Sequence, residues 1–167
     1  MSCRLNAIVA VCDDWGIGLG GGMVVENRDD MRHFVECTTG HAVLMGRRTL
    51  ESFPGERPLR NRRNVVLTRD ASFSRDGVET VHTLEEALEA VSGEEEAWVI
   101  GGGEVYRQLL PRCARAVVTK NHCVRAVDTR FPNLDEDPSW TVEEVRAGGV
   151  TPEGVPFDFV TYVRTGA

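Results

Sequence analysis

The sequence predicts an α/β protein whose single domain, residues 1–167, is built on a mostly parallel sheet. Short runs rich in apolar and β-branched residues alternate with segments of helical period, and no internal repeat or low-complexity tract interrupts them. The length of 167 residues suits one domain. Two β-rich runs near the carboxyl terminus flank a turn-rich segment, which is typical of an antiparallel hairpin. We therefore expect a central sheet of about eight strands that ends in this hairpin and is flanked by about four helices.

The first strand and the first helix are clearly marked. Residues 5–12 form a nearly continuous apolar run, typical of a central strand that is covered on both faces. A glycine-rich loop over 13–27 follows, and then a helix over 29–37 with Asn27 or Asp29 as its N-cap. The spacing i, i+3 and i+4 predicts a buried stripe made of Met31, Phe34 and Val35.

The later elements alternate in the same way. Thr83 is the predicted cap of a helix in which Glu86 occupies the capping-box position, and Pro111 ends the next helix. The terminal hairpin joins residues 140–145 to residues 157–164. The remaining expected elements are strands over 41–45, 64–68, 78–81, 97–100 and 116–119, and helices over 47–52, 83–91 and 104–110.

The composition argues against nucleic acid or an anionic membrane as a partner, because the formal net charge is −7. The longest wholly apolar run, residues 7–12, is far too short to cross a bilayer, and no signal-peptide pattern precedes it. The five cysteines are scattered and include no CxxC pair, so we expect neither a disulfide framework nor a metal site. These features predict a soluble, cytoplasmic protein.

Positive charge is concentrated in one segment. Between Gly46 and Arg75 the chain has eight arginines and three acidic residues, a net charge of +5, whereas the rest of the chain carries −12. A solvated arginine-rich loop would account for this pattern, but so would a place where an anionic small molecule is held.

Three glycine-rich junctions follow predicted strands and compete as phosphate-binding sites. Residues 16–21 match GxGxxG, but no helix follows at once, so a flexible loop or lid is the better interpretation. Gly101, Gly102 and Gly103 stand between a strand and a helix, where backbone N–H groups can approach an anion, although a tight turn explains them as well. Gly46 is followed by Arg47, Arg48 and Thr49, a set that suits a phosphate monoester.

Six blocks of residues occur in a characteristic order along the chain. They are Leu5 to Val11 with Gly16-Ile17-Gly18; Met45 to Thr49 with Glu51-Ser52; Arg57-Pro58-Leu59; Arg62-Arg63-Asn64; Ile100 to Gly103 with Val105-Tyr106; and Asp128-Thr129 with Phe131-Pro132. In this order and spacing they resemble the dihydrofolate reductase family over nearly the whole chain. The resemblance implies that family's fold and hydride transfer from NADPH to 7,8-dihydrofolate, which yields tetrahydrofolate.

The resemblance implies that Asp30 is the catalytic carboxylate, which hydrogen-bonds the pterin and promotes protonation of N5, and that Thr119 supports its hydrogen bonds. An acid between Met31 and Phe34 is partly desolvated, which raises its pKa toward neutrality. Asp30 could instead cap the helix, but Asp29 is the better placed of the two for that role.

The same register implies the binding residues. The pterin and aminobenzoyl pocket would be lined by Ile8, Val9, Met31, Phe34 and Leu59, each of which core packing alone could also explain, with Arg62 pairing the glutamyl carboxylate and Arg57 assisting. NADPH would be bound by Ala10, Ile17, Gly18, Met23, Gly46, Arg47, Arg48, Thr49, Thr68, Arg69, His82, Gly101, Gly102, Gly103, Glu104, Val105 and Tyr106. Within this set, Arg47, Arg48, Thr49, Thr68 and Arg69 would surround the adenosine 2′-phosphate.

Departures from the family pattern concentrate before the first helix. Met23 is kept, whereas Val24 replaces a proline and Val25 replaces a tryptophan that normally orients a water beside the carboxylate. We expect a looser lid and therefore reduced turnover or altered antifolate sensitivity. Glu104 places a negative charge near the pyrophosphate, or else caps its helix.

Two other functions fit the same residues. A reductase of the same fold could act on another heterocycle, such as the pyrimidine of riboflavin synthesis, although Asp30 with Arg62 argues for a folate. A non-catalytic NADPH-binding module is the second alternative. The expected partners are dihydrofolate and antifolates, with no nucleic acid or membrane, and the expected state is a monomer.

Overall fold

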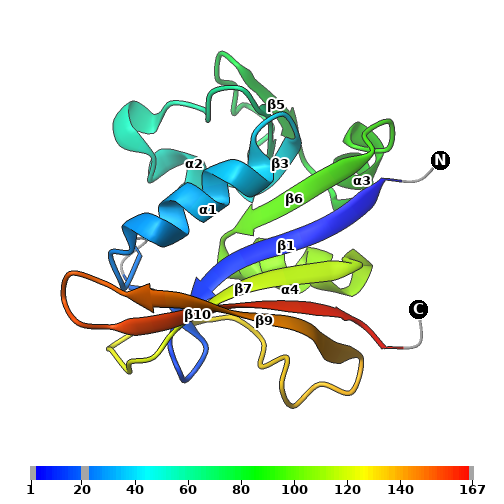
Figure 1. Ribbon diagram of the computed structural model, residues 1–167. Coiled ribbons are helices and arrows are strands. Elements are labelled where there is room, and N and C mark those ends of the chain that lie inside the picture. Colours follow the sequence, from blue (N-terminus) through cyan, green and yellow to red (C-terminus); the bar gives the residue numbers. More distant parts are fainter. Residues whose placement is uncertain (1–2, 20–22, 166–167) are drawn as a thin grey trace.

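A central sheet of eight strands runs through the molecule (Figure 1). The computed structural model describes residues 3–19 and 23–165. In sheet order the strands are β5 (Val78–Val81), β4 (Arg63–Leu67), β3 (Ala42–Gly46), β6 (Glu96–Gly101), β1 (Arg4–Val11), β7 (Arg115–Asn121), β10 (Pro156–Arg164) and β9 (Trp140–Val150).

The sheet is parallel from β5 to β7 and antiparallel at its last two pairings. Strand β10 lies between β7 and β9, so the terminal hairpin is inserted with its second strand inward and β9 at the edge. The expected mostly parallel sheet with an antiparallel hairpin is therefore confirmed. Because β1 is central and covered on both faces, it reads as a continuous apolar run.

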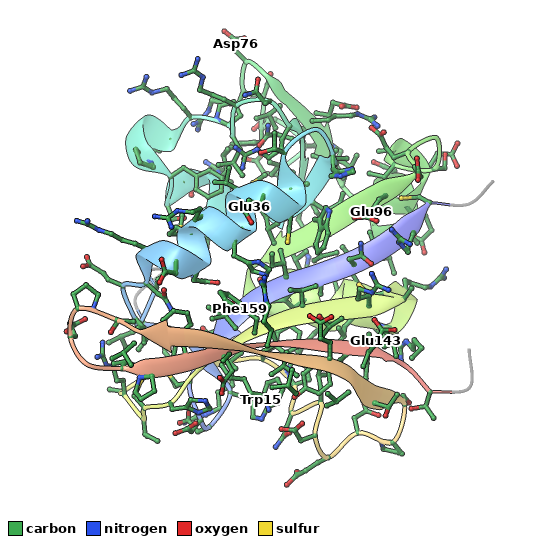
Figure 2. The ribbon with its side chains drawn as sticks, in the orientation of Figure 1. Trp15, Glu36, Asp76, Glu96, Glu143 and Phe159 are labelled. Carbon is green, nitrogen blue, oxygen red and sulfur yellow. The ribbon has the colours of Figure 1, made fainter. Side chains whose placement is uncertain are left out.

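Helices cover both faces of the sheet. Helices α1 (Arg28–Thr38) and α2 (Arg47–Glu51) pack on one face, whereas α3 (Leu84–Ala90) and α4 (Gly103–Leu109) pack on the other. Each face has its own apolar core. In Figure 2, Phe159 of β10 lies on the α1 side of the hairpin and Trp15 on the opposite side. No helix in the described part of the chain is both long and apolar enough to cross a membrane.

Local signals explain where two of the helices begin. Thr83 accepts a hydrogen bond from the Glu86 N–H at 3.0 Å, as the capping-box pattern predicts. For α1 the cap is Asn27, one of the two predicted candidates, whose Oδ1 accepts from the Asp30 N–H at 3.0 Å. Neither Asp29 nor Asp30 caps the helix, because both lie in its first turn. Asn27 also donates to Asn121 Oδ1 at 3.0 Å, which fixes the start of α1 against the end of β7.

The predicted buried stripe of α1 is wrong as well. Met31 is 48% exposed and Val35 is 44% exposed, while the buried residues of the helix are Asp30 and Thr38. The helix therefore turns polar side chains toward the sheet, together with the half-buried Phe34. A hydrophobic periodicity cannot show this orientation, because the inward-facing residues Asp30 and Thr38 are polar.

Four short elements have no clear sequence signal. Strands β2 (Gly16–Gly18) and β8 (Thr129–Arg130) pair as a small second sheet, and η1 (Pro54–Glu56) and η2 (Leu110–Arg112) are single 3₁₀ turns. Two or three residues are too few to display a period of 2. The small sheet ties the glycine-rich loop after β1 to the segment that precedes Phe131.

Candidate active site

The predicted site residues gather at one edge of the sheet. Strands β1, β3, β6 and β7 are parallel, so their carboxyl ends meet there, and α1 starts beside the end of β7. Ligands of open parallel sheets bind in the crevice outside these carboxyl ends. The sheet topology thus brings together candidate residues that are far apart in the sequence.

Asp30 is a buried carboxylate in the first turn of α1. Only 7% of the residue is exposed, and Thr119 Oγ1 on β7 donates a hydrogen bond to Asp30 Oδ1 at 2.5 Å. Burial raises the pKa of Asp30 above its ordinary value, and the hydrogen bond from Thr119 opposes this shift by stabilising the charged form. The desolvation expected for this acid is therefore present, and it can exchange a proton closer to neutrality than a surface aspartate.

The α1 side of the sheet, where this carboxylate lies, also carries an apolar core. Ile8 is 5% exposed and belongs to the same core as the partly buried Phe34 and Leu59. Asn64 accepts from the Leu59 N–H at 3.0 Å and donates to the Leu59 carbonyl at 2.9 Å, which fixes the position of this loop residue.

Two other predicted pocket residues have different surroundings. Val9 points its side chain into the core on the α3 and α4 side, so it can offer only its backbone to the α1 side. Successive residues of a strand face opposite ways, so the side chain of Ile8, and not that of Val9, lies on the α1 side. Met31 is largely exposed at the amino-terminal end of α1, where it can cover a ligand but is not part of a core.

Arg62 is a half-buried cation held by neutral groups. Its Nη1 donates to Thr38 Oγ1 at 3.2 Å and its Nε donates to the Arg60 carbonyl at 2.9 Å. Among the described residues no carboxylate forms an ion pair with it, and burial lowers the pKa of its guanidinium. Arg62 can therefore receive a carboxylate from a ligand, whereas Arg57 is exposed to solvent.

A cleft of about 750 Å³ lies beside the carboxyl ends of β3, β4 and β6. Nine of the residues predicted for the cofactor line it, namely Gly46, Arg48, Thr68, Arg69, His82, Gly102, Gly103, Glu104 and Val105. The sequence interpretation missed eight more, namely Leu67, Thr83, Leu84, Arg107, Gln108, Asp128, Thr129 and Arg130. Of these eight, Asp128 and Thr129 belong to one of the six sequence blocks. That block is the one sequence signal for this side of the cleft.

Glycine is required at two positions of the β6–α4 junction. Gly101 has φ = +129°, a conformation that side chains rarely adopt. A Cβ on Gly103 would stand 2.6 Å from Thr129 Cγ2, too close for any other residue. Gly102 and Gly103 of this junction both line the cleft. Thr49 lies next to it, with its hydroxyl 3.4 Å from the place of a Gly101 Cβ.

Eight predicted cofactor residues do not line the cleft, and two of them, Arg47 and Tyr106, are bound elsewhere. Arg47 is bound by Glu51 and by Asp70, at 3.0 Å in each case, and its guanidinium stacks over Phe73 at 4.7 Å. Tyr106 is fully buried and donates from its hydroxyl to the Ile8 carbonyl at 2.7 Å, which joins α4 to β1.

The charges of the cleft are mixed. Arg48 and Arg69 form no ion pair with any described carboxylate, so both are available to an anion. Glu104 accepts from Arg107 at 2.6 Å and from Gln108 at 3.1 Å, and these donors lower the pKa of its carboxyl. The cap of α4 is Gly102 with no side-chain hydrogen bond, so the suggestion that Glu104 caps this helix is wrong.

The predicted lid lies against the end of β1. Ala10, Ile17 and Met23 line a cavity of about 10 Å³ together with Val24 and Val25. Gly18 lies on β2, where its carbonyl accepts from the Asp128 N–H at 2.8 Å. The part of the lid at 20–22 falls outside the described residues.

A residue that the sequence interpretation missed holds this segment. Arg125 Nη1 donates to the Val24 carbonyl at 3.0 Å, across about a hundred residues of sequence. Val25, in the place of the family's tryptophan, is only 4% exposed. The lid stem is thus packed and anchored despite lacking the family's proline.

These features place the chain among the α/β proteins that bind a phosphate-bearing cofactor at the carboxyl edge of a parallel sheet, next to a buried acid. The family profile described as dihydrofolate reductase matches residues 4–164, and the chain belongs to the dihydrofolate reductase family.

Individual relatives agree with this assignment. The dihydrofolate reductase of Mycobacterium tuberculosis (strain ATCC 25618 / H37Rv) is 50% identical over 124 residues, which are 72% of this chain and 74% of the relative. That of Neisseria gonorrhoeae is 35% identical over 160 residues, covering 96% and 98% of the two chains. The structure of dihydrofolate reductase from Enterococcus faecalis complexed with NADP(H) and RAB-propyl superposes with a TM-score of 0.89 at 30% identity, covering 99% of each chain.

Proposed function

We propose that this chain reduces 7,8-dihydrofolate to 5,6,7,8-tetrahydrofolate with NADPH. The observation that carries the proposal is Asp30, a buried carboxylate bonded to Thr119 at the carboxyl edge of the sheet, in a chain of the dihydrofolate reductase family. A buried acid of raised pKa is the group that a proton transfer near neutrality requires.

The cleft has the size and donors that NADPH requires. Gly102 and Gly103 line the cleft without side chains of their own, so a pyrophosphate can approach their backbone N–H groups. Arg48 and Arg69 are free to pair with the 2′-phosphate, and Thr49 and Thr68 add hydroxyl groups nearby. When bound, NADPH supplies the hydride that adds to C6 of the pterin.

The chain's own residues position the pterin and supply the proton. Asp30 accepts hydrogen bonds from the ring N–H and the amino group, and it promotes protonation of N5 as the hydride arrives at C6. Ile8 and Phe34 line the ring's apolar surroundings and exclude water, which keeps the pKa of Asp30 raised. Thr119 orients the carboxylate through its hydrogen bond. Antifolates that mimic the pterin would use the same carboxylate.

Arg62 selects substrates that end in a carboxylate. Its fork is already oriented by Thr38 and by the Arg60 carbonyl, so pairing with the glutamyl carboxylate requires little further ordering. Leu59, fixed by Asn64, packs against the aminobenzoyl ring that leads to this group. Arg57 assists from the solvent-exposed rim.

We further propose that the protein acts in the cytoplasm as a monomer. The five cysteines are all free thiols, as a reducing compartment would keep them. Light scattering of the purified protein would measure the oligomeric state.

The experiment compares the wild-type protein with Asp30→Asn and Asp29→Asn. NADPH oxidation in the presence of dihydrofolate is followed at the absorbance band of reduced nicotinamide, and NADPH binding is measured separately by fluorescence. Removing the buried acid should lower kcat about 10²- to 10⁴-fold while NADPH still binds. The exposed Asp29, one position earlier on the same helix, should be replaceable with little loss.

The alternatives predict different results. A wild-type protein that binds NADPH but oxidises none of it with dihydrofolate would contradict the proposal and favour a reductase of another heterocycle. Binding of NADPH with neither substrate nor antifolate affinity would favour a non-catalytic module. Full activity of Asp30→Asn would remove Asp30 from the mechanism.

A further inference from the structure

Two cysteines from distant parts of the sequence face each other beside the lid. Cys12 follows the end of β1 and Cys123 follows the end of β7, and their Sγ atoms are 3.8 Å apart. The backbones are in register there, because the Asp13 N–H donates to the Cys123 carbonyl at 3.0 Å. These two loops lie side by side beneath the hairpin (Figure 1). Among the described cysteines, this is the one pair of sulfur atoms in contact.

The pair adjoins the parts of the molecule that form the lid. Cys12 lines the same small cavity as Ala10, Ile17 and Val25. Arg125, two residues after Cys123, is the side chain that holds the Val24 carbonyl. Closing a bond between the sulfurs would therefore tie the loop after β1 to the loop that anchors the lid stem.

We propose that Cys12 and Cys123 form a reversible disulfide that slows the lid. The oxidant is a low-molecular-weight disulfide, RSSR. The Cys123 thiolate attacks one sulfur of RSSR, so that the S–S bond breaks, one RS⁻ leaves and a mixed disulfide forms on Cys123. The Cys12 sulfur, as its proton passes to water, then attacks the Cys123 sulfur and expels the second RS⁻. Two protein thiols are oxidised and one RSSR is reduced to two RSH.

The exposures of the two thiols set this order. Cys123 is half-buried and can meet a small disulfide, whereas Cys12 is 3% exposed and cannot. Burial and the neighbouring thiol raise the pKa of Cys12 to about 12, which keeps it protonated and unreactive toward a disulfide in solution. It therefore reacts only in the second, intramolecular step, after it has lost its proton. Cys113 is also buried with a pKa raised to about 12, but its Sγ donates to the Leu109 carbonyl inside the α4-side core.

The test is a titration with oxidised glutathione, read by intact mass and by peptide mapping. The wild-type chain should lose two of its five thiols, lose the mass of two hydrogen atoms and yield a peptide that links residues 12 and 123. Cys12→Ser should stop at a glutathione adduct on Cys123. Cys37→Ser, which removes another partly buried thiol, should form the cross-link as the wild type does. A wild-type chain that stops at a glutathione adduct, or links Cys123 to another cysteine, overturns the proposal.

A second arm measures the effect on the lid and rests on the proposed function. The cross-linked protein should release NADPH several-fold more slowly in stopped-flow fluorescence and recover with dithiothreitol, while Cys123→Ser treated in the same way should not change. If the cross-link is mapped but the rate of NADPH release is unchanged, the proposal that the disulfide slows the lid is overturned. Absence of dihydrofolate reduction would contradict the proposed function alone, since mass and NADPH release do not depend on turnover.

Discussion

Burial and a single hydrogen bond act on Asp30 in opposite directions. Burial disfavours the charged carboxylate and raises its pKa, whereas the Thr119 hydroxyl donates to that carboxylate and lowers the pKa. The balance sets the pH above which the protonated form disappears. A conservative change at Thr119 should therefore shift the pH dependence of kcat while the carboxylate of Asp30 is kept.

We expect Thr119→Val to raise the pKa of Asp30 further, because valine fills the same space but donates nothing. Since the protonated carboxyl promotes the reaction, the alkaline fall in kcat should move to higher pH. Steady-state rates from pH 5 to 9 would measure this midpoint, with Thr161→Val on the adjacent strand β10 as the control. A midpoint that is unchanged or moves to lower pH would show that Thr119 does not act through Asp30.

Arg62 offers a second test at the level of one side chain. Arg62→Lys keeps the positive charge but loses the planar fork that pairs with a carboxylate. Charge-assisted hydrogen bonds are worth about 1.5–3 kcal/mol, so KM for dihydrofolate should rise about 10- to 100-fold with kcat nearly kept. A dihydropterin that lacks the glutamyl group serves as the control substrate. An equal rise in KM for that compound would contradict the assignment.

The lid stem shows how one element can lose its usual constraints and keep its place. Val24 and Val25 remove a proline and an indole, and the sequence alone therefore predicts loosening. In the structure the Val24 carbonyl is bound by Arg125, whose guanidinium also lies 3.9 Å from Glu153 in the hairpin turn. The hydrogen bond from Arg125 thus holds the backbone at Val24, where a proline would otherwise restrict it.

Arg125→Met should release the stem while keeping the aliphatic part of the side chain. We expect NADPH dissociation to become about 5- to 10-fold faster, as the loss of one hydrogen bond of about 1 kcal/mol predicts. Stopped-flow displacement would measure the rate, with Arg112→Met, on the exposed turn η2, as the control. If NADPH dissociates from Arg125→Met and from Arg112→Met at the same rate, Arg125 does not position the lid.

The elements differ in how well the sequence predicts them. Helix α3 is predicted from its cap and capping box, and the sheet from its apolar runs, because these signals are local. The inward face of α1 is not predicted in this way, since its buried residues Asp30 and Thr38 are polar and add nothing to a hydrophobic period. Arg125 and the Cys12 contact come from irregular loops, and only the fold brings their partners near. In contrast, Asp30 can be proposed from the sequence, because the family pattern that includes Met31 and Phe34 is local to one helix.

Over the whole molecule, the uneven charge of the sequence corresponds to an uneven surface. The arginine-rich segment 46–75 contributes Arg48 and Arg69 to the lining of the cleft and Arg62 to the contact with Thr38 of α1. Other members of the segment are neutralised, as Arg47 is by Glu51 and Asp70. The concentration of charge seen in the sequence was therefore informative, although individual arginines differ in role.

His122 contacts two carboxylates, one just after the first strand and one on the last strand. Its Nε2 lies 2.7 Å from Asp158 Oδ2 on the last strand, β10, and its Nδ1 lies 3.2 Å from Asp13 Oδ1 after the first strand, β1. Only the protonated imidazole can donate to both carboxylates, so these hydrogen bonds raise its pKa above the ordinary value. Folding therefore favours the protonated form over the neutral one.

The sign of the pH dependence follows from this raised pKa. The stabilisation is fully present below the ordinary histidine pKa of about 6.5, and it is lost as the pH rises through the higher value of the folded state. His122→Gln should lower the free energy of unfolding at pH 5.5 by about 0.2–1 kcal/mol, a small effect because the side chain is 40% exposed. At pH 9 the two proteins should be almost equally stable. Urea denaturation at both values would measure the difference, and a deficit that is larger at pH 9 would exclude a charged His122 as the link between the two carboxylates.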